Sequence, residues 1–296
     1  MVQQFLLPDW VMGCDGRAFK EDRVQEMQDL GTLQGDVLLF GGPYSNLQAS
    51  EAVLGEAAER GILAGNAICT GDVTAYCGQP RETVAALRAW GCVVVAGNCE
   101  VQLAAEAMDC GCGFEAGTAC DLLSAGWFAH VSREVDVAAR VWMAGLPGMV
   151  VFRHAGRRVA VIHGGVTEIA RFIWETSPEA VFAEEVAAIE AAAGPVDMVV
   201  AGHSGIAFRR EVAGVMWVNA GVIGMPPHNG LQATSFAILS ENGIEICDLR
   251  YDAREAFAEM QRAGLTQGYD RALLSGYWPS EDVLPSDLRE SSRASG

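Results

Sequence analysis

Four short loops carry the residue types that bind metal ions, and each loop follows an apolar run. Glycine beside each polar residue lets the backbone turn sharply, and the preceding run predicts a strand that holds the loop at a sheet edge. Ligands of open α/β sheets bind at that edge. The loops are Gly71-Asp72, Gly97-Asn98-Cys99-Glu100, His163-Gly164-Gly165 and Gly202-His203-Ser204-Gly205.

The chemistry of these loops favours a divalent metal ion. A carboxylate, a carboxamide oxygen and two imidazoles form a mixed oxygen and nitrogen set that suits Mn, Fe, Ni, Co or Zn. Each residue also has an ordinary explanation: Asp72 could cap the next helix, Asn98 could be a turn residue, and the histidines could be satisfied core residues. We favour the metal site because all four residues share one frame of strand, glycine and loop. The predicted ligands are Asp72, Asn98, His163 and His203.

The remaining histidines lack this frame. We expect His130, His154 and His228 to have structural or surface roles, although His228 follows two prolines in a loop that could approach a substrate. Arg171, Arg209 and Arg210 are candidates for contact with an anion, because an arginine can bind an oxyanion through two hydrogen bonds.

The elements that position these loops alternate between strand and helix patterns. Short apolar runs at 37–40, 67–69 and 93–95 alternate with helical spacing at 47–60 and 81–90. Further strands are expected at 149–152, 159–162, 198–201, 215–218, 235–239 and 244–249, with a helix at 178–193. This order predicts two sheets packed face to face with helices outside. We expect an irregular or helical lead-in over 1–35, a domain over 36–252 with a helical insertion at about 101–146, and a C-terminal helix and polar tail over 253–296.

Composition excludes several classes of protein. With 296 residues, 50% of them hydrophobic, the chain can bury about 73% of its surface, which excludes disorder. A net charge of −18 disfavours nucleic acid and anionic membrane surfaces as partners. No apolar run approaches the roughly 18 residues that span a bilayer. The first nine residues lack the pattern of an export signal, so we expect a cytoplasmic protein. A homo-oligomer stays open.

The nine cysteines are an odd number in a chain without an export signal. We therefore expect free thiols, with a reactive or metal-binding minority, rather than a disulfide framework. Cys110, Cys112 and Cys120 do not have a spacing typical of a zinc site.

In their order and approximate spacing, the four loops resemble the motifs of the calcineurin-like metallophosphoesterase superfamily, in particular its bacterial phosphoesterases. Those motifs read Asp-x-His, Gly-Asp, Gly-Asn-His-Asp/Glu, His and Gly-His-x-His. The resemblance covers about residues 36–250. Ser45-Asn46-Leu47-Gln48-Ala49 resembles the Gly-Asn-Leu-x-Ala that follows the first motif, and residues 218–224 resemble a late Asn-Pro-Gly-Ser-Val-Gly loop. The resemblance implies an α/β fold, a four-layer αββα sandwich of two mixed sheets, and hydrolysis of phosphate esters.

The departures from these motifs affect one metal position. Gly42 and Tyr44 stand in place of the first motif's aspartate and histidine, Cys99 replaces the histidine after the asparagine, and Gly205 replaces the last histidine. The resemblance implies that one metal set is complete, whereas the other, degenerate set keeps only Asp72. We therefore expect one metal ion per chain, or none.

The leading hypothesis is a metal-dependent hydrolase that acts on a small phosphate monoester or phosphodiester. Tyr44 and Cys99 are the catalytic candidates near the leaving group. Cys99 could also be a thiolate ligand of a soft ion or an inert buried residue. The substrate-binding candidates are Asn46, Ser204 and Asn219. Two alternatives remain: a catalytically inactive, ligand-binding module on the same fold, and a thiol-dependent redox activity of Cys99.

Overall fold

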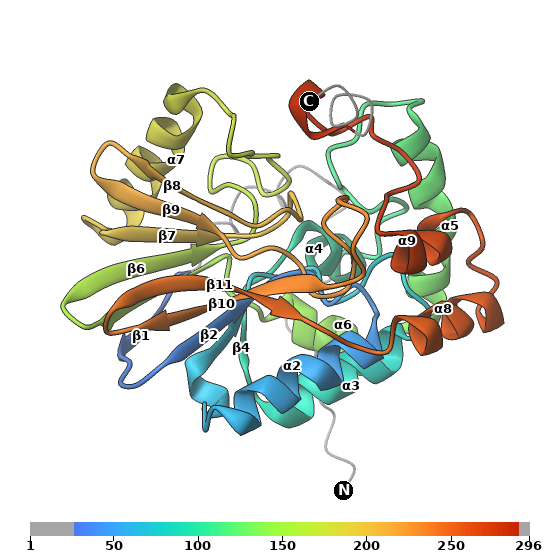
Figure 1. The fold of residues 1–296 in the computed structure, drawn as a ribbon, viewed down its shortest axis with the longest axis horizontal. Helices are drawn as coiled ribbons and strands as arrows, with labels where there is room; N and C mark the ends of the chain where they lie inside the picture. The colour runs from blue at the N-terminus through green and yellow to red at the C-terminus, as the bar shows by residue number, and fades with distance from the viewer. Residues whose placement is uncertain (1–26, 290–296) are drawn as a thin grey trace, which may run out of the picture.

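The computed structural model describes residues 27–289, and two β-sheets face each other in it with helices on both outer sides (Figure 1). One sheet has six strands in the order β1-β5-β6-β7-β9-β8, and the other has five in the order β11-β10-β2-β3-β4. Both sheets are mixed, since β6 pairs antiparallel with β5 and parallel with β7, while β2 pairs antiparallel with β10 and parallel with β3. The predicted αββα sandwich is therefore confirmed.

Nine of the eleven described strands lie close to their predicted positions, whereas β1 and β8 were not predicted. The six-stranded sheet contains β1 (Met27–Thr32), β5 (Met149–His154), β6 (Arg157–Ile162), β7 (Met198–Ala201), β8 (Phe208–Val212) and β9 (Val215–Asn219). The five-stranded sheet contains β2 (Val37–Phe40), β3 (Ala67–Cys69), β4 (Val93–Val94), β10 (Thr234–Ser240) and β11 (Gly243–Leu249).

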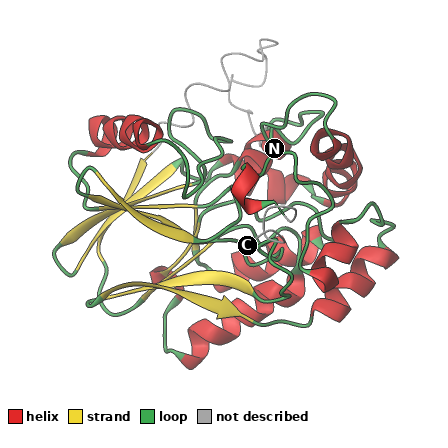
Figure 2. Ribbon diagram, turned by 45° about the horizontal axis from the view of Figure 1, so that its top comes forward, coloured by secondary structure: helices red, strands yellow, loops and turns green. Residues whose placement is uncertain are grey.

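The helices cover the outer faces of the sheets. Helix α7 (Glu179–Ala193) packs Phe182 and Ile189 against the six-stranded sheet. On the other side, α2 (Leu47–Glu59) and α3 (Pro80–Trp90) cover the five-stranded sheet (Figure 1). Figure 2 shows the strands at one side of the molecule and most helices at the other. The remaining helices are α4 (Asn98–Ala104), α5 (Ala119–Glu134), α6 (Val137–Ala144), α8 (Ala253–Arg262) and α9 (Tyr269–Ser275), with short 3₁₀ turns at Ala64–Asn66 and Ser286–Leu288.

The central strands are buried on both faces. In β2, Val37 and Leu39 point into the core between the sheets, while Leu38 and Phe40 point toward the outer helices. Successive side chains of a strand point to opposite faces, so burial of both faces requires an uninterrupted apolar run. These rigid strands hold the loops at their carboxyl ends.

Strand β1 corrects the prediction of an irregular or helical lead-in. Met27–Thr32 forms an edge strand that pairs in parallel with β5, although five of its six residues are exposed. Backbone pairing rather than side-chain burial holds it, so its sequence lacks the apolar alternation of a half-buried strand. Residues 1–26 of the lead-in lie outside the described residues.

Over 27–289, no helix is both long and apolar enough to cross a bilayer.

Candidate metal centre

The two sheets converge at the loops that carry the predicted ligands. Asp72 follows β3 and Asn98 begins α4 just beyond β4, whereas His163 and His203 follow β6 and β7 of the other sheet. A Cβ atom on Gly202 would lie 2.2 Å from Thr70 Oγ1, and one on Gly71 would lie 2.6 Å from the backbone nitrogen of Gly97. Only glycine permits such close approach, so these positions bring the four loops together.

The structure brings all four predicted ligands to one buried point. The Nε2 atom of His163 lies 2.9 Å from Asn98 Oδ1, 3.0 Å from His203 Nδ1 and 3.4 Å from Asp72 Oδ2. The other ring nitrogen of His163, Nδ1, lies 2.7 Å from the carbonyl oxygen of Thr70 and donates to it. That bond places the proton on Nδ1 and leaves the Nε2 lone pair directed at the cluster.

This donor set fits a divalent cation. Ligand atoms of Asp72, His163 and His203 all lie within 4.8 Å of one another. In the neutral histidine, the Nε2 lone pair of His163 faces an amide oxygen, a carboxylate oxygen and a second imidazole, an arrangement that a positive charge between them would stabilise. His203 Nε2 is buried and has no hydrogen-bond partner among residues 27–289. The four residues could thus supply two oxygen and two nitrogen ligands.

The ionisation states of these groups suit cation binding. Burial raises the pKa of Asp72, but His163, His203 and the backbone N–H of Cys99 together outweigh burial, so the pKa lies below its ordinary value and the carboxylate stays charged. Burial and the neighbouring His163 lower the pKa of His203 to about 3, which keeps that imidazole neutral. Burial lowers the pKa of His163, but the charge of Asp72 and its hydrogen bond to the ring raise the pKa. The pKa of His163 therefore lies above its ordinary value. A bound cation would therefore compete with a proton at His163.

Glu100 joins the loop of Asp72 to the loop of Asn98. Its buried carboxylate accepts hydrogen bonds from the backbone nitrogens of Asp72 at 2.8 Å, Val73 at 2.9 Å and Gly97 at 2.9 Å. Burial and Asp72 raise the pKa of Glu100 to about 7. Sequence reasoning noted Glu100 only as part of a motif. Its place three residues after Gly97, the N-cap of α4, is the capping-box position that could have identified this role.

Asn98 is oriented by the segment that contains Cys110 and Cys112. Its Nδ2 donates to the carbonyl oxygen of Cys110 at 2.9 Å and lies 3.4 Å from Cys112 Sγ, which turns Oδ1 toward His163. A disulfide joins Cys110 to Cys112 and corrects the expectation of free thiols at these two positions. Among the described cysteines the other six are free, in accordance with the absence of a disulfide framework.

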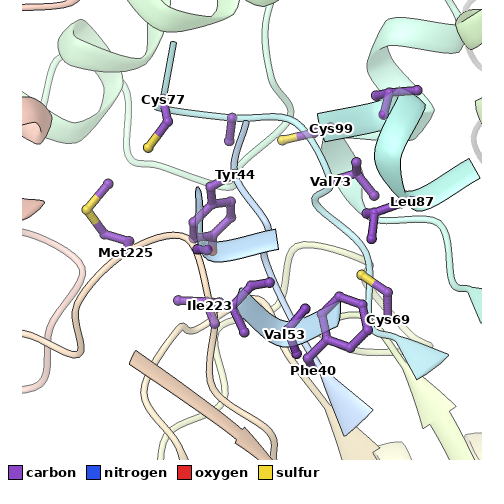
Figure 3. Packing of buried hydrophobic residues seen from close by; sticks show 14 of the residues in the cluster. Phe40, Tyr44, Val53, Cys69, Val73, Cys77, Leu87, Cys99, Ile223 and Met225 are labelled. Atoms are coloured by element: carbon purple, nitrogen blue, oxygen red, sulfur yellow. The ribbon is translucent and has the colours of Figure 1, made fainter. Parts of the chain in front are cut away.

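Tyr44 fills the space of the missing first motif. A Cβ atom on Gly42 would lie 2.6 Å from Tyr44 Cζ and 2.6 Å from Val222 Cγ1, so the phenol ring leaves no room for an aspartate there. Figure 3 shows Tyr44 in one apolar cluster with Cys99 and Met225. Burial and the charge of Asp72 raise the pKa values of the Tyr44 phenol and the Cys99 thiol. Both groups therefore stay protonated, and their catalytic roles remain predictions.

The three substrate-binding candidates form internal hydrogen bonds. Asn46 caps α2 by accepting from the nitrogen of Ala49, and its Nδ2 donates to the carbonyl oxygen of Gly224. Asn219 Nδ2 donates to Ser204 Oγ at 2.8 Å, and Ser204 Oγ donates to the carbonyl oxygen of Ile173. These bonds stabilise the loops around the centre, and substrate contact by the three residues stays a prediction.

The arginine candidates contact protein groups outside the metal cluster. Arg171 pairs with Glu184 and Glu185, Arg209 donates to the carbonyl oxygen of Ile244, and Arg210 donates to the carbonyl oxygens of Glu175 and Ser177.

The sequence did not predict the aromatic residues that lie beside the centre. The ring centroid of Phe172 lies 4.4 Å from that of His203, and the C-terminal Trp278 lies near Gly205.

Known proteins share sequence features with this chain. The profile of the calcineurin-like phosphoesterase superfamily domain matches residues 45–243. An uncharacterized protein of Methanocaldococcus jannaschii is 25% identical over 253 residues, which cover 79% of this chain and 95% of that protein.

Two solved structures share the fold. A metallophosphoesterase from Sphaerobacter thermophilus aligns with a TM-score of 0.62 at 18% identity, covering 82% of this chain and 100% of the other. A hypothetical protein from Pyrococcus horikoshii aligns with a TM-score of 0.65 at 14% identity, covering 81% and 98%.

Proposed function

The chain belongs to the calcineurin-like phosphoesterase superfamily, and we propose that it hydrolyses a small phosphate monoester or phosphodiester with one metal ion per chain. The observation that supports this proposal is the convergence of Asp72, Asn98, His163 and His203 on one buried point. The net charge of −18 disfavours nucleic acid as the substrate and leaves small phosphate esters as the fitting class.

The proposed number of metal ions follows from Tyr44 and Gly42. Of the motif residues that would hold the other ion only Asp72 remains, and the ring of Tyr44 lies against Gly42. A single carboxylate without further protein ligands holds a divalent ion poorly. The site therefore favours one ion, on the side of His163 and His203.

A divalent ion bound there would polarise a phosphoryl oxygen and lower the pKa of its bound water. The chain's own residues would hold the reactants. His163 keeps its Nδ1 proton on the carbonyl oxygen of Thr70 at 2.7 Å and directs Nε2 inward, and Glu100 fixes the backbone of Asp72. Tyr44 keeps its phenolic proton, because burial raises its pKa, and can donate a hydrogen bond to a substrate oxygen.

Metal content and hydrolysis should be measured on the same preparations. Purified full-length protein is loaded with Mn²⁺ or Zn²⁺, its metal is quantified by mass spectrometry, and bis(4-nitrophenyl) phosphate is the test substrate. We expect one ion per chain and turnover that Asp72→Asn and His163→Ala both abolish. His154→Gln is the matched control, since His154 is also buried but lies at the opposite end of the β5–β6 pair.

Three outcomes would contradict the proposal. Full metal occupancy without turnover of any phosphate ester would favour the inactive, ligand-binding module instead. Turnover that survives His163→Ala would place the chemistry elsewhere in the chain. Loss of metal on Cys99→Ser, with the fold retained, would favour the thiol-dependent alternative.

A further inference from the structure

An aromatic pocket opens beside the metal centre. His203 belongs to both, since it forms part of the pocket wall and is also one of the four predicted ligands. Its enclosed cavity is about 50 Å³, and the empty space together with the open mouth is about 470 Å³, so a ligand ring would occupy the cavity and its mouth together. No lysine, arginine, aspartate or glutamate is among its lining residues. Its flat or apolar walls include Tyr44, Phe114, Phe172, Val222, Met225 and Trp278.

One wall is a row of rings that ends at His203. The Phe172 ring is stacked on Phe114 with centroids 6.1 Å apart, and its centroid lies 4.4 Å from that of His203. Trp174 stacks on Phe172 at 5.8 Å and an angle of 5°. Phe172 is thus held in place from several sides and presents a fixed apolar surface next to a metal ligand.

Another part of the lining comes from the segment that contains Trp278, Ser280 and Val283. Trp278 Nε1 donates to the carbonyl oxygen of Pro226 at 2.6 Å, and its backbone nitrogen donates to His228 Nδ1 at 2.8 Å. A Cβ atom on Gly205 would lie 3.5 Å from the Trp278 ring. Trp278 therefore lies in van der Waals contact with the position at which the family motif has its last histidine.

We propose that this pocket binds an uncharged, planar aromatic group of the substrate while the phosphate lies at the metal centre; the inference rests on the proposed function. Flat apolar walls stabilise an aromatic ring by stacking and by burial of its surface. A second phosphate group would find no cationic side chain among the lining residues. The geometry thus points to an aryl or nucleobase ester with a single phosphate rather than to a di- or triphosphate.

Binding measured without turnover tests this inference. Phenylphosphonate and methylphosphonate carry the same anionic group but differ in the ring, and their affinities for the Mn²⁺-loaded protein can be compared by calorimetry. Stacking on one aromatic side chain is worth roughly 1–3 kcal/mol. We expect phenylphosphonate to bind about tenfold more tightly or better. Phe172→Ala or Trp278→Ala should remove most of this preference and leave methylphosphonate affinity unchanged.

Conservative variants keep the test decisive if an alanine variant unfolds. Trp278→Phe retains a flat ring and should keep most of the preference, whereas Phe172→Leu should lose it. Trp142→Ala is the control, because Trp142 is partly buried on α6 and does not line the pocket. Equal affinity for both phosphonates in the wild-type protein would overturn this inference while leaving the metal site intact. Failure of both phosphonates to bind the metal-loaded protein would instead overturn the proposed function.

Discussion

Replacing Glu100 by glutamine tests how the metal centre is held in place. The Glu100 carboxylate is fully buried and accepts three backbone hydrogen bonds, from Asp72, Val73 and Gly97. A glutamine offers one oxygen and one NH₂ group in the same space. In its better orientation the oxygen faces Asp72 and Gly97, and the NH₂ group faces the N–H of Val73, so two donors meet.

The cost follows from these contacts. A buried N–H without a partner costs about 1–3 kcal/mol, and the two remaining bonds lose the strength that a charged acceptor adds. Part of this loss is recovered because a neutral amide is easier to bury than a carboxylate whose pKa is raised to about 7. We expect the free energy of unfolding to fall by roughly 2 kcal/mol. Metal affinity should fall roughly 10- to 100-fold, since Asp72 has a φ of +54° and the next residue, Val73, loses the anchor of its N–H.

Two measurements on one variant separate these effects. Urea unfolding of the metal-free protein gives the stability, and competition with a chelating dye gives the Mn²⁺ affinity. Asp270→Asn is the matched control: Asp270 is buried and accepts hydrogen bonds from Gln261 and Gly268, but it is not one of the predicted ligands. It should lower stability without changing metal affinity. If Glu100→Gln binds Mn²⁺ within twofold of the wild type, this account of Glu100 is refuted.

Three further predictions concern the surroundings of the centre. Gly42→Asp should lower the free energy of unfolding by about 1–3 kcal/mol without adding a second metal ion, because its Cβ would overlap Tyr44 and Val222 and the backbone has a φ of +41°. Gly42→Asp with Tyr44→His should recover only part of that stability in urea unfolding, since the overlap with Val222 and the backbone strain remain. An unaffected single variant would contradict this packing. Metal binding at pH 6 should release protons, because the pKa of His163 is raised and the protonated imidazole must lose its proton to bind a cation. Metal affinity should therefore rise with pH. Calorimetry in buffers of different ionisation enthalpy measures the protons released, and no release would refute this prediction. Replacing Cys110 and Cys112 by serine should weaken Mn²⁺ binding severalfold through Asn98, whereas Cys247→Ser should not, and equal affinities of the two variants would count against this contact.

The sandwich could be predicted because its central strands are buried on both faces. Residues such as Val37, Leu38, Leu39 and Phe40 form an unbroken apolar run, and a glycine marks the point where the run stops. The metal ligands could be predicted for the same reason, since each follows such a run by one to three residues. Parallel strands bring their carboxyl ends together, so this local pattern also determines where the ligands meet.

Other features depend on contacts that the local sequence does not show. β1 is mostly exposed and β8 alternates only weakly, so neither has the continuous apolar pattern of the central strands. The aromatic pocket is lined by both Phe172 and Trp278, which lie 106 positions apart in the sequence. No local pattern at either residue indicates that the two share a pocket. The Cys110–Cys112 bridge depends on the conformation of a loop between helices, which spacing alone does not specify.

Anomalous diffraction at the manganese edge, from crystals grown with Mn²⁺, tests the central claim most directly. We predict one peak per chain, bounded by Asp72 Oδ2, Asn98 Oδ1, His163 Nε2 and a ring nitrogen of His203. A second peak beside Gly42, Tyr44 and Gly205 would contradict the single-ion site. No peak among the four ligands at saturating Mn²⁺ would contradict a manganese site there.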